Sequence, residues 1–327
     1  MNTAYDTDSG MRVARRDARR RRQRLRAVVL AALAVAVAGG VAVGAHSLRT
    51  VRKAAPPRVP PVTAEPTALA PTRSRTIARA KPLAAAPYPV RAASRSAAVP
   101  ILMYHVIAPA PADAPYPGLY VTPHDFAAQV DALVHAGFHA VTLDQMRAAW
   151  RGTAGLPSRP IVLTFDNGYR SQYTAALPVL RRVGWVADEN LQLTGLPPRE
   201  GGLTVTQIRA LVQAGWELDT QGYNHADLTA LDAAQLRFQV AVTRARLQRL
   251  YGVGVSWFCY PSGRYDQAVV DAVRAAGFVG ATTVVSGWAR PTVDPYTLPR
   301  LRVLGGTTPV QLLAQIADAR EQQPPSA

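Results

Sequence analysis

The feature that most constrains the fold of this chain is a short junction that occurs four times: AGF from Ala136, VGW from Val183, AGW from Ala214 and AGF from Ala276. In each copy a glycine follows an amphipathic segment, where helices commonly end on a left-handed residue, and an aromatic residue then begins an apolar run. Repeated use of this junction predicts helices that lead into strands, which is the pattern of consecutive βα units.

Eight short apolar runs supply the strands for such a fold. The strand candidates span residues 100–107, 139–143, 161–166, 186–193, 216–221, 256–261, 278–284 and 298–303. Between them lie amphipathic segments, such as the one that begins with Thr122 as the capping residue and Pro123 at the first helical position. We therefore expect an α/β fold, a single, distorted (β/α) barrel-like domain of seven to eight βα units, with its chemistry at the carboxyl ends of the strands.

The amino-terminal quarter of the chain has a different organisation. Nine arginines in residues 1–26 precede 19 uncharged residues, 27–45. About 20 apolar residues span a bilayer and a basic flank stays in the cytoplasm. This predicts a cytoplasmic tail over 1–26, a transmembrane signal anchor over 27–45 and an extracytoplasmic location for the rest of the chain. The small residues Val43 and Ala45 also fit a cleavage site, so a secreted protein released by signal cleavage is the alternative.

The segment after this anchor has the composition of a spacer. Residues 46–98 are rich in Pro, Ala, Arg and Ser and have no apolar periodicity, which is typical of a disordered linker. The folded domain is expected over residues 99–320, followed by a flexible tail over 321–327. The sequence therefore predicts a domain held away from a membrane.

The formal net charge of +16 comes almost entirely from the amino-terminal part. Residues 1–96 contain 19 of the 37 basic residues and 4 of the 21 acidic residues. Residues 97–327 contain 18 basic and 17 acidic residues, so the folded domain is close to neutral. This excludes the broad basic footprint of a nucleic-acid-binding domain, and we expect no nucleic-acid partner.

Polar residues follow three of the apolar runs, and they carry the candidate chemistry. The three stretches are TFDNGY (164–169), DTQGYNH (219–225) and CYPSGRYD (259–266). The carboxyl ends of parallel strands meet at one edge of a sheet, so these stretches are expected to lie together. Taken alone, Asp166 also fits a capping carboxylate, because Asp followed by Asn-Gly is common in turns.

In this order the three stretches resemble the polysaccharide deacetylase family, the NodB homology domain of carbohydrate esterase family four. The resemblance covers roughly residues 99–305. The opening PILMYHV and the later LPRLRV look most like the secreted poly-N-acetylglucosamine deacetylase branch. The resemblance to this family implies hydrolysis of the amide of N-acetylated cell-wall or exopolysaccharide sugars, with a divalent zinc, cobalt or nickel ion as cofactor.

The resemblance assigns the site residues by position. The family motif TFDDG provides a general base, matched by Asp166, and a metal-binding Asp, replaced here by Asn167. The motif H-[ST]-x-x-H provides two histidine ligands, of which Gln221 replaces the first and His225 matches the second. Since Asn and Gln offer only neutral oxygens, we expect weak metal binding or none. Asp219 faces the same side of its strand as Gln221 and is a candidate substitute carboxylate, with a structural role as the alternative.

The general acid and the sugar-binding surface are assigned less directly. No histidine follows His225, so His105 in the MYH stretch is the candidate acid, and the alternative is a hydrogen-bonded histidine at a strand end. Cys259 stands where many family members have an arginine that steadies the base. The aromatic residues expected to stack on sugar are Tyr169, Tyr223, Tyr260 and Trp288.

Two functional hypotheses follow from these residues. The first is a membrane-anchored deacetylase of N-acetylated polysaccharide or peptidoglycan with a degraded metal site and weak or atypical activity. The second is a non-catalytic glycan-binding or wall-binding protein that keeps the fold and the groove. The metal positions discriminate between them, because a hydrolase of this kind depends on its ion to activate water.

Overall fold

The computed structural model describes residues 95–196 and 200–321. The predicted cytoplasmic tail, the transmembrane anchor and nearly all of the linker lie outside these residues. Among the residues described, no helix combines the length and the apolar character needed to cross a bilayer.

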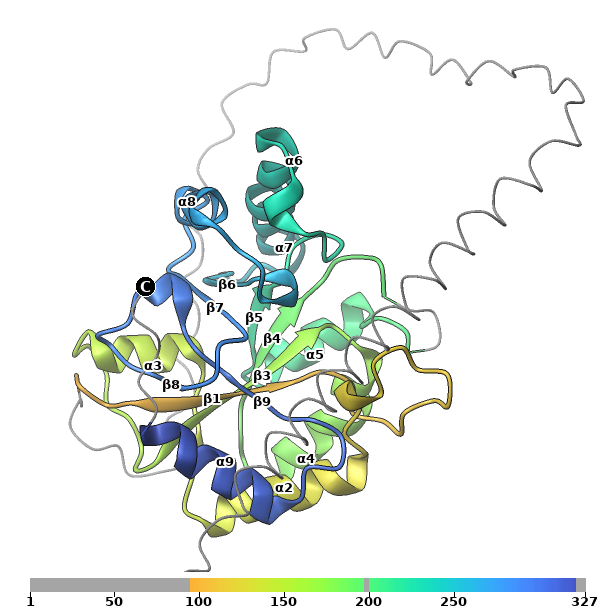
Figure 1. Ribbon diagram of the computed structural model, residues 1–327, viewed down its shortest axis with the longest axis vertical. Coiled ribbons are helices and arrows are strands. Elements are labelled where there is room, and N and C mark those ends of the chain that lie inside the picture. The colour runs from red at the N-terminus through yellow and green to blue at the C-terminus, as the bar shows by residue number, and fades with distance from the viewer. Residues whose placement is uncertain (1–94, 197–199, 322–327) are drawn as a thin grey trace, which may run out of the picture. The chain divides into compact units, whose positions relative to one another are not determined.

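Strands and helices alternate along the described chain, as the junction repeat predicts (Figure 1). The strands are β1 (Val99–Tyr104), β2 (His139–Ala140), β3 (Pro160–Asn167), β4 (Asp188–Leu191), β5 (Glu217–Thr220), β6 (Trp257–Cys259), β7 (Gly280–Thr282), β8 (Trp288–Ala289) and β9 (Leu301–Arg302). The helices are α2 (Pro123–His135), α3 (Leu143–Trp150), α4 (Leu177–Arg182), α5 (Val205–Gln213), α6 (Ala233–Arg237), α7 (Thr243–Tyr251), α8 (Gln267–Ala275) and α9 (Pro309–Glu321).

The four glycine junctions have the predicted backbone conformation. Gly137, Gly184, Gly215 and Gly277 follow α2, α4, α5 and α8 with φ between 69° and 89°, in the left-handed region where glycine meets no steric penalty. Each therefore ends its helix and turns the chain into the segment that leads to the next strand.

The strands form one sheet in the order β7-β6-β5-β4-β3-β1-β8, with β2 beside β3 and β9 beside β1. All pairs are parallel except β1 with β8. Each of the eight predicted strands contains or overlaps an observed one, although most are shorter than predicted. The two-residue strand β8 was not predicted, and it interrupts the βα alternation after β7.

The sheet is strongly curled. Cys259 of β6 lies 3.5 Å from Asp166 of β3, although β4 and β5 stand between these strands in the sheet. In a flat sheet, strands about 4.8 Å apart would separate β3 from β6 by about 14 Å. At the other side, Leu298 forms a parallel bridge with Thr282 of β7 just before its own chain enters β9, which pairs with β1. The α/β barrel-like expectation is thus met by a curled, mostly parallel sheet.

Alternate residues of β3 face two different environments. Ile161, Leu163 and Phe165 point outward into a cluster shared with α2, α4 and α9, whereas Val162, Thr164 and Asp166 point to the inner face. In Figure 1 the three helices lie together beneath β1 and β3. The outer layer is held by aromatic contacts, with Phe165 5.6 Å from Tyr104 and 5.0 Å from Trp216 between ring centroids. Burial of this outer face leaves the inner face free for polar groups.

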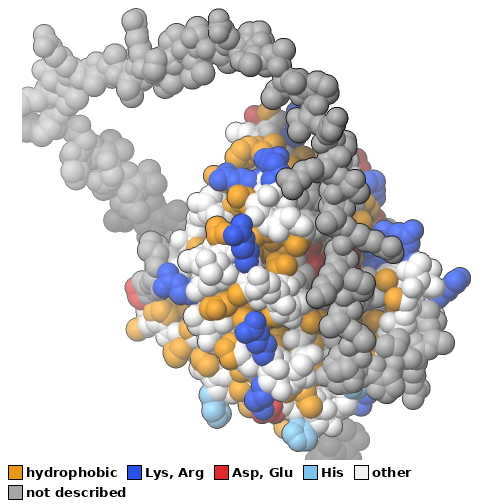
Figure 2. Space-filling model, turned by 180° about the vertical axis from the view of Figure 1, so that it is seen from behind, with side chains coloured by type: hydrophobic (Ala, Val, Ile, Leu, Met, Phe, Trp, Pro, Cys, Tyr) orange, Lys and Arg blue, Asp and Glu red, His pale blue; other side chains and the backbone are white. Residues whose placement is uncertain are grey.

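Figure 2 shows basic side chains spaced apart among hydrophobic and uncharged ones on the face that it presents. Every basic side chain of residues 97–327 is an arginine. Several of them lie over aromatic rings, with the guanidinium carbon of Arg159 4.5 Å from the ring centroid of Phe138 and that of Arg274 4.5 Å from the ring centroid of Tyr296, so they pack locally against the protein.

Candidate functional site

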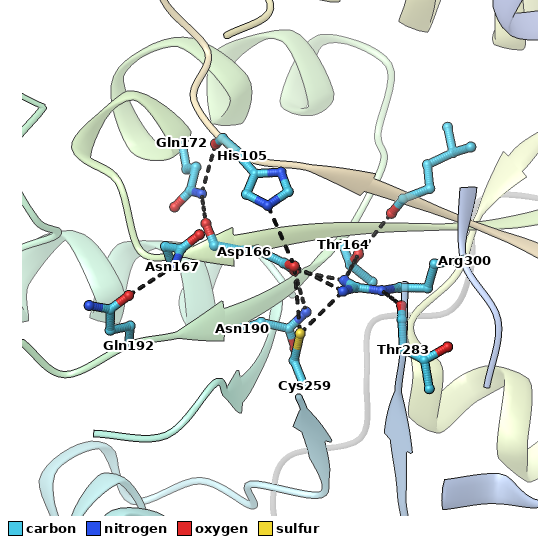
Figure 3. Close-up of polar contacts among 11 residues, drawn as sticks. His105, Thr164, Asp166, Asn167, Gln172, Asn190, Gln192, Cys259, Thr283 and Arg300 are labelled. Carbon is cyan, nitrogen blue, oxygen red and sulfur yellow. Dashed lines mark hydrogen bonds and ion pairs between the residues drawn. The ribbon is translucent and has the colours of Figure 1, made fainter. Parts of the chain in front are cut away.

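Asp166 lies at the centre of a buried polar group near the carboxyl end of β3 (Figure 3). Arg300 donates two hydrogen bonds to it, from Nη1 to Oδ1 at 2.7 Å and from Nη2 to Oδ2 at 2.9 Å. Asn190 Nδ2 donates to Oδ1 at 2.8 Å, and the thiol of Cys259 lies 3.5 Å from Oδ2. All four side chains are almost completely buried. A two-point guanidinium contact of this kind fixes both the charge and the orientation of the carboxylate.

Arg300, like Asn190, is a residue of this site that sequence reasoning missed. Arg300 lies on the short segment that runs from Leu298, which forms a bridge with β7, to the start of β9. This segment places its guanidinium beside Asp166. Its remaining contacts are Nε to the carbonyl of Thr283 at 2.8 Å, Nη1 to Thr164 Oγ1 at 2.9 Å and Nη2 to Cys259 Sγ at 3.2 Å. An arginine flanked by apolar residues in a predicted strand is expected to be buried, and a buried arginine needs an anionic partner. The stretch LPRLRV (298–303) has this pattern at Arg300, so the sequence did contain a signal for it.

The arginine also explains the unusual cysteine. The sequence resemblance places Cys259 at the position of an arginine that steadies the base, and the guanidinium of Arg300 lies against its sulfur from a different segment. Burial raises the pKa of the Cys259 thiol to about 12, with Arg300 acting in the opposite direction. The thiol is therefore protonated, and it can donate to Asp166 rather than act as a nucleophile.

Asp166 is ionised at neutral pH. Burial by itself would raise the pKa of Asp166, but the charge and hydrogen bonds of Arg300, together with His105 and the amide of Asn190, lower this pKa to about 2. The carboxylate is thus a permanent anion and only a weak proton acceptor.

His105 directly follows β1 and lies beside this anion. Its Nε2 is 3.9 Å from Asp166 Oδ2, and its Nδ1 is buried with no hydrogen-bond partner among the described residues. Burial lowers the pKa of His105 to about 4, although the charge of Asp166 acts in the opposite direction. Gln172 donates from Nε2 to the backbone carbonyls of both His105 and Asp166, at 3.0 and 2.8 Å, and so ties the two strand ends together. The structure therefore brings the predicted base and the predicted acid into one site.

This environment predicts a neutral His105 at physiological pH. In a titration of the imidazole resonances by nuclear magnetic resonance, assigned with a His105→Gln variant, the midpoint for His105 should lie near pH 4. A midpoint near 6.5, the ordinary value, would show that the imidazole is solvated and not enclosed beside Asp166.

The three positions that correspond to metal ligands also lie near Asp166. Asn167 ends β3 with φ 81°, Gln221 directly follows β5, and His225 has φ 58° in the loop after it. Asn167 Nδ2 donates to Gln192 Oε1 at 2.8 Å, so its amide is already engaged within the protein. Burial lowers the pKa of the half-buried His225, against the charge of Asp166.

This set of donors does not fit a tightly held zinc, cobalt or nickel ion. Gln221 Oε1 is buried without a partner and could face an ion, but Asn167 has turned its amide nitrogen toward Gln192. The set contains one imidazole and two neutral amides, whereas zinc prefers thiolate, imidazole and carboxylate ligands. Asp219, the candidate substitute carboxylate, is instead grouped with Asp188 and Glu217, and its Oδ1 accepts from the backbone N–H groups of Ser256 and Trp257 at 3.1 and 2.8 Å.

Of the four predicted sugar-stacking residues, two lie near the site. Tyr169 is two residues beyond β3, and burial with the charges of Glu200 and Asp166 raises its pKa to about 12. Tyr223 borders a cavity of about 380 Å³, which also has Gly168 and Gln192 in its wall and so adjoins the metal-ligand positions. These two residues remain candidates for sugar contact.

The assignment of Tyr260 and Trp288 to the sugar surface was wrong. Tyr260 is fully buried, donates its hydroxyl to the carbonyl of Tyr296 at 3.0 Å and stacks on Tyr265 at 4.6 Å. Trp288 lies in β8 opposite Pro100, at the amino end of β1, and donates Nε1 to the carbonyl of Ile316 in α9 at 2.8 Å. Periodicity could not tell exposed from packed aromatic residues, and the antiparallel strand β8 was unforeseen.

Comparisons with known proteins identify the domain. The sequence profile of the polysaccharide deacetylase family matches residues 153–281. YxkH of Bacillus subtilis (strain 168), assigned by name to the polysaccharide deacetylases, is 25% identical over 212 residues, which are 65% of this chain and 74% of YxkH. The poly-β-1,6-N-acetyl-D-glucosamine N-deacetylase of Escherichia coli (strain K12) is 45% identical, but over only 51 residues, 16% of this chain and 8% of that enzyme.

Solved structures share the fold. The deacetylase PplD of Streptococcus pyogenes, determined in complex with acetate, superposes with a TM-score of 0.62 at 24% identity, over 68% of this chain and 99% of PplD. IcaB of Ammonifex degensii superposes with a TM-score of 0.56 at 23% identity, over 67% of this chain and 96% of IcaB. The matched range includes Asp166, Asn167, Gln221 and His225. The part of the chain that the structure describes therefore contains a polysaccharide deacetylase domain of the NodB type, which the profile matches over residues 153–281.

Proposed function

We propose that this protein binds N-acetylated polysaccharide of a cell wall or exopolysaccharide at the carboxyl edge of its sheet, and hydrolyses the N-acetyl amide slowly. The observation that carries the proposal is the Asp166 carboxylate, held by Arg300 and adjacent to His105, in a domain of the deacetylase family. The name of the Escherichia coli relative supports an N-acetylglucosamine polymer as the substrate class.

The chemistry requires water, one proton acceptor and one proton donor. Water adds to the acetyl carbonyl and its proton passes to Asp166. The carbon–nitrogen bond breaks as this same proton is returned to the leaving amine, with the neutral imidazole of His105 relaying it by accepting at one ring nitrogen and donating from the other. Acetate and a free amine are the products. Backbone N–H groups at the strand ends are the available donors for the oxygen that becomes negative.

The proton acceptor explains why the reaction should be slow. Bulk water has a pKa of about 15.7, and a catalytic metal lowers it to about 7. Transfer to a carboxylate whose pKa is about 2 is therefore far more unfavourable from bulk water than from metal-bound water. Because Asn167 and Gln221 do not provide the usual ligands, we expect any zinc, cobalt or nickel to be held weakly, and the activity to be low.

The proposed location is the outer face of a membrane. The basic tail and the uncharged segment 27–45 support a single-pass anchor with the domain outside, and cleavage after Ala45 would give a secreted form instead. A linker of about 50 residues would allow the domain to reach polysaccharide at a distance from the bilayer.

A second candidate is a glycan-binding protein without catalysis. The hydrogen bond from Asn167 to Gln192 favours it, because an amide that is satisfied by the protein has no need of an ion. The cavity beside Tyr223 would then serve recognition alone.

One experiment separates the two candidates. The full-length protein, kept in detergent and treated with chelator, is given β-1,4- and β-1,6-linked N-acetylglucosamine oligomers, and binding and acetate release are both measured. We expect binding, weakened about 10-fold by Tyr223→Ala and unchanged by Trp288→Phe at the opposite end of the sheet. We also expect slow acetate release, reduced at least about 100-fold by Asp166→Asn and by His105→Gln.

Each result has a defined meaning. Binding without acetate release would favour the glycan-binding candidate. Release that survives both substitutions would place the chemistry elsewhere, and neither binding nor release with any oligomer would reject the proposal.

A further inference from the structure

A second group of carboxylates lies on the inner face of the sheet, nearer the amino ends of the strands. Asp188 begins β4, Glu217 begins β5 and Asp219 follows two residues later. In the sheet register Asp188 stands beside Thr164 and Asn190 beside Asp166, so the group lies about two residues below the Asp166 site. One oxygen from each of the three carboxylates lies within 4.8 Å of the others.

Backbone N–H groups hold one oxygen of each carboxylate in place. Asp188 Oδ1 accepts from Leu143 N at 2.9 Å, and Glu217 Oε2 accepts from Asp144 N at 3.0 Å, both at the start of α3. Asp219 Oδ1 accepts from the two backbone N–H groups that lead into β6, at 3.1 and 2.8 Å. The three side chains are therefore fixed in orientation and cannot turn to find other partners.

The second oxygens of the three carboxylates are buried and lack a donor of their own. Asp188 and Glu217 can hydrogen-bond each other only by sharing a proton, and Glu217 is also within reach of Thr142. Asp219 Oδ2 has no hydrogen-bond partner among the described residues, and the geometry gives none to Asp188 Oδ2 or Glu217 Oε1 while both are ionised. Asp188 and Asp219 are fully buried, whereas Glu217 is partly exposed. No described Lys, Arg or His side chain forms an ion pair with any of them, and Arg244 acts on Asp219 only from a longer range.

The negative charge at this point is not balanced by the protein. Burial, and then the charges of Glu217 and Asp219, raise the pKa of Asp188 well above its ordinary value. Asp144 adds a further carboxylate, but its two oxygens already accept from Ser256 Oγ and Trp257 Nε1, at 3.0 and 3.1 Å. Three unpaired carboxylate oxygens in a buried place require either protons or a cation.

We propose that Asp188, Glu217 and Asp219 form a site for a divalent cation that prefers oxygen ligands, such as calcium. Calcium binds carboxylate oxygens at about 2.3–2.6 Å and accepts about six to eight of them in a flexible geometry. One oxygen of each carboxylate lies within 4.8 Å of the others, so a single ion can contact all three, and water would complete its coordination from the partly exposed side of Glu217.

This site differs from the metal position of the deacetylases in place and in chemistry. It contains none of Asn167, Gln221 and His225, and its ligands are all carboxylate oxygens. The carboxylates already contact the start of α3 and the start of β6 through their other oxygens. An ion bound to all three would therefore link α3, β4, β5 and β6 and stabilise the inner face of the sheet next to Asp166.

The test uses the full-length protein after removal of metal with chelator, and calcium chloride as the only addition. Calcium at a hundredfold excess over its Kd should raise the midpoint of thermal unfolding by about 5–10 °C. Asp219→Asn keeps the oxygen that accepts from Trp257 but removes the charge, so it should weaken calcium binding at least about 10-fold. Asp271→Asn, at an exposed carboxylate of α8, and His225→Ala, at the family position, should leave the calcium effect unchanged.

Terbium luminescence gives a readout that does not depend on stability. Terbium replaces calcium at oxygen sites and is excited by a nearby indole, and Trp257 lies next to Asp219 and Asp144. We expect sensitised emission that calcium displaces and that Asp219→Asn abolishes. If millimolar calcium changes neither signal, or if Asp219→Asn leaves both the calcium-dependent stabilisation and the terbium emission unchanged, the carboxylates share protons instead and the proposal is overturned.

Discussion

The double substitution Asn167→Asp with Gln221→His should give this protein tight binding of zinc, cobalt or nickel. The two changes restore one carboxylate and one imidazole beside His225, which provides the three-ligand set of an open catalytic site. We expect the affinity for these ions to rise at least about 100-fold, since even residues that only support metal ligands change affinity by about 10–100-fold. Acetate release from N-acetylglucosamine oligomers should rise with it, because bound water becomes far more acidic.

The structure adds a condition to this result. The new carboxylate of Asn167→Asp would face Gln192 Oε1, which now accepts from the Asn167 amide at 2.8 Å. Gln192 must turn its amide so that nitrogen faces Asp, which breaks its present bond to the carbonyl of Thr194. This rearrangement is small compared with the gain from a charged ligand, so each single variant should bind more weakly than the double variant.

The measurement is metal content and calorimetric titration of the full-length wild type, the single variants and the double variant. His225→Ala in the double variant serves as the control and should remove most of the gain. No improvement in the double variant would contradict the correspondence between these positions and the family motifs.

The second large effect is expected from Arg300→Met, which should reduce the free energy of unfolding at pH 7 by about 3–5 kcal/mol. Arg300 is fully buried and makes both of its strongest hydrogen bonds to Asp166, so the substitution leaves a buried carboxylate without its countercharge. The matched control is Arg302→Met, two residues along the same segment, whose side chain is exposed. It should change the free energy of unfolding by no more than about 0.5 kcal/mol.

The pH dependence of this loss follows from the pKa of Asp166. In the wild type the folded pKa is about 2, below the ordinary 3.8, so the pair stabilises the folded protein above about pH 4 and loses this contribution as the pH falls toward 2. Without Arg300, burial dominates and raises the pKa of Asp166 above 3.8. The variant then loses stability as the pH rises through that value, so the difference from the wild type should be largest at neutral pH and smallest in acid.

Chemical denaturation at several pH values would measure this difference. The further change Asp166→Leu in the Arg300→Met variant removes the stranded charge and should restore more than half of the lost stability. A loss that does not vary with pH, or no recovery in the double variant, would show that Arg300 acts through packing rather than through its pairing with Asp166.

The order of strands and helices could be predicted from the sequence because it depends on local chemistry. The glycines of the four junctions have left-handed backbones, as expected from their place between amphipathic and apolar segments. The strand β8 was missed because it contains only two residues, Trp288 and Ala289, which are too few to show an alternation of apolar and polar side chains. Only its pairing with β1 makes it a strand. The misplacement of Trp288 follows from this.

The sequence by itself determined which residues are available for the site. Asp166, Asn167, Gln221, His225 and His105 lie at or just after the carboxyl ends of strands, and those ends must meet, so their motifs were enough to suggest the deacetylase domain, while the change of metal ligands stays a prediction. Only the tertiary structure decided that the carboxyl group of Asp166 is ionised and paired, because its partner Arg300 lies 134 residues away along the chain. The grouping of Asp188, Glu217 and Asp219 was also decided there. Charge pairing and burial depend on distances between segments, and these distances arise only when the sheet curls.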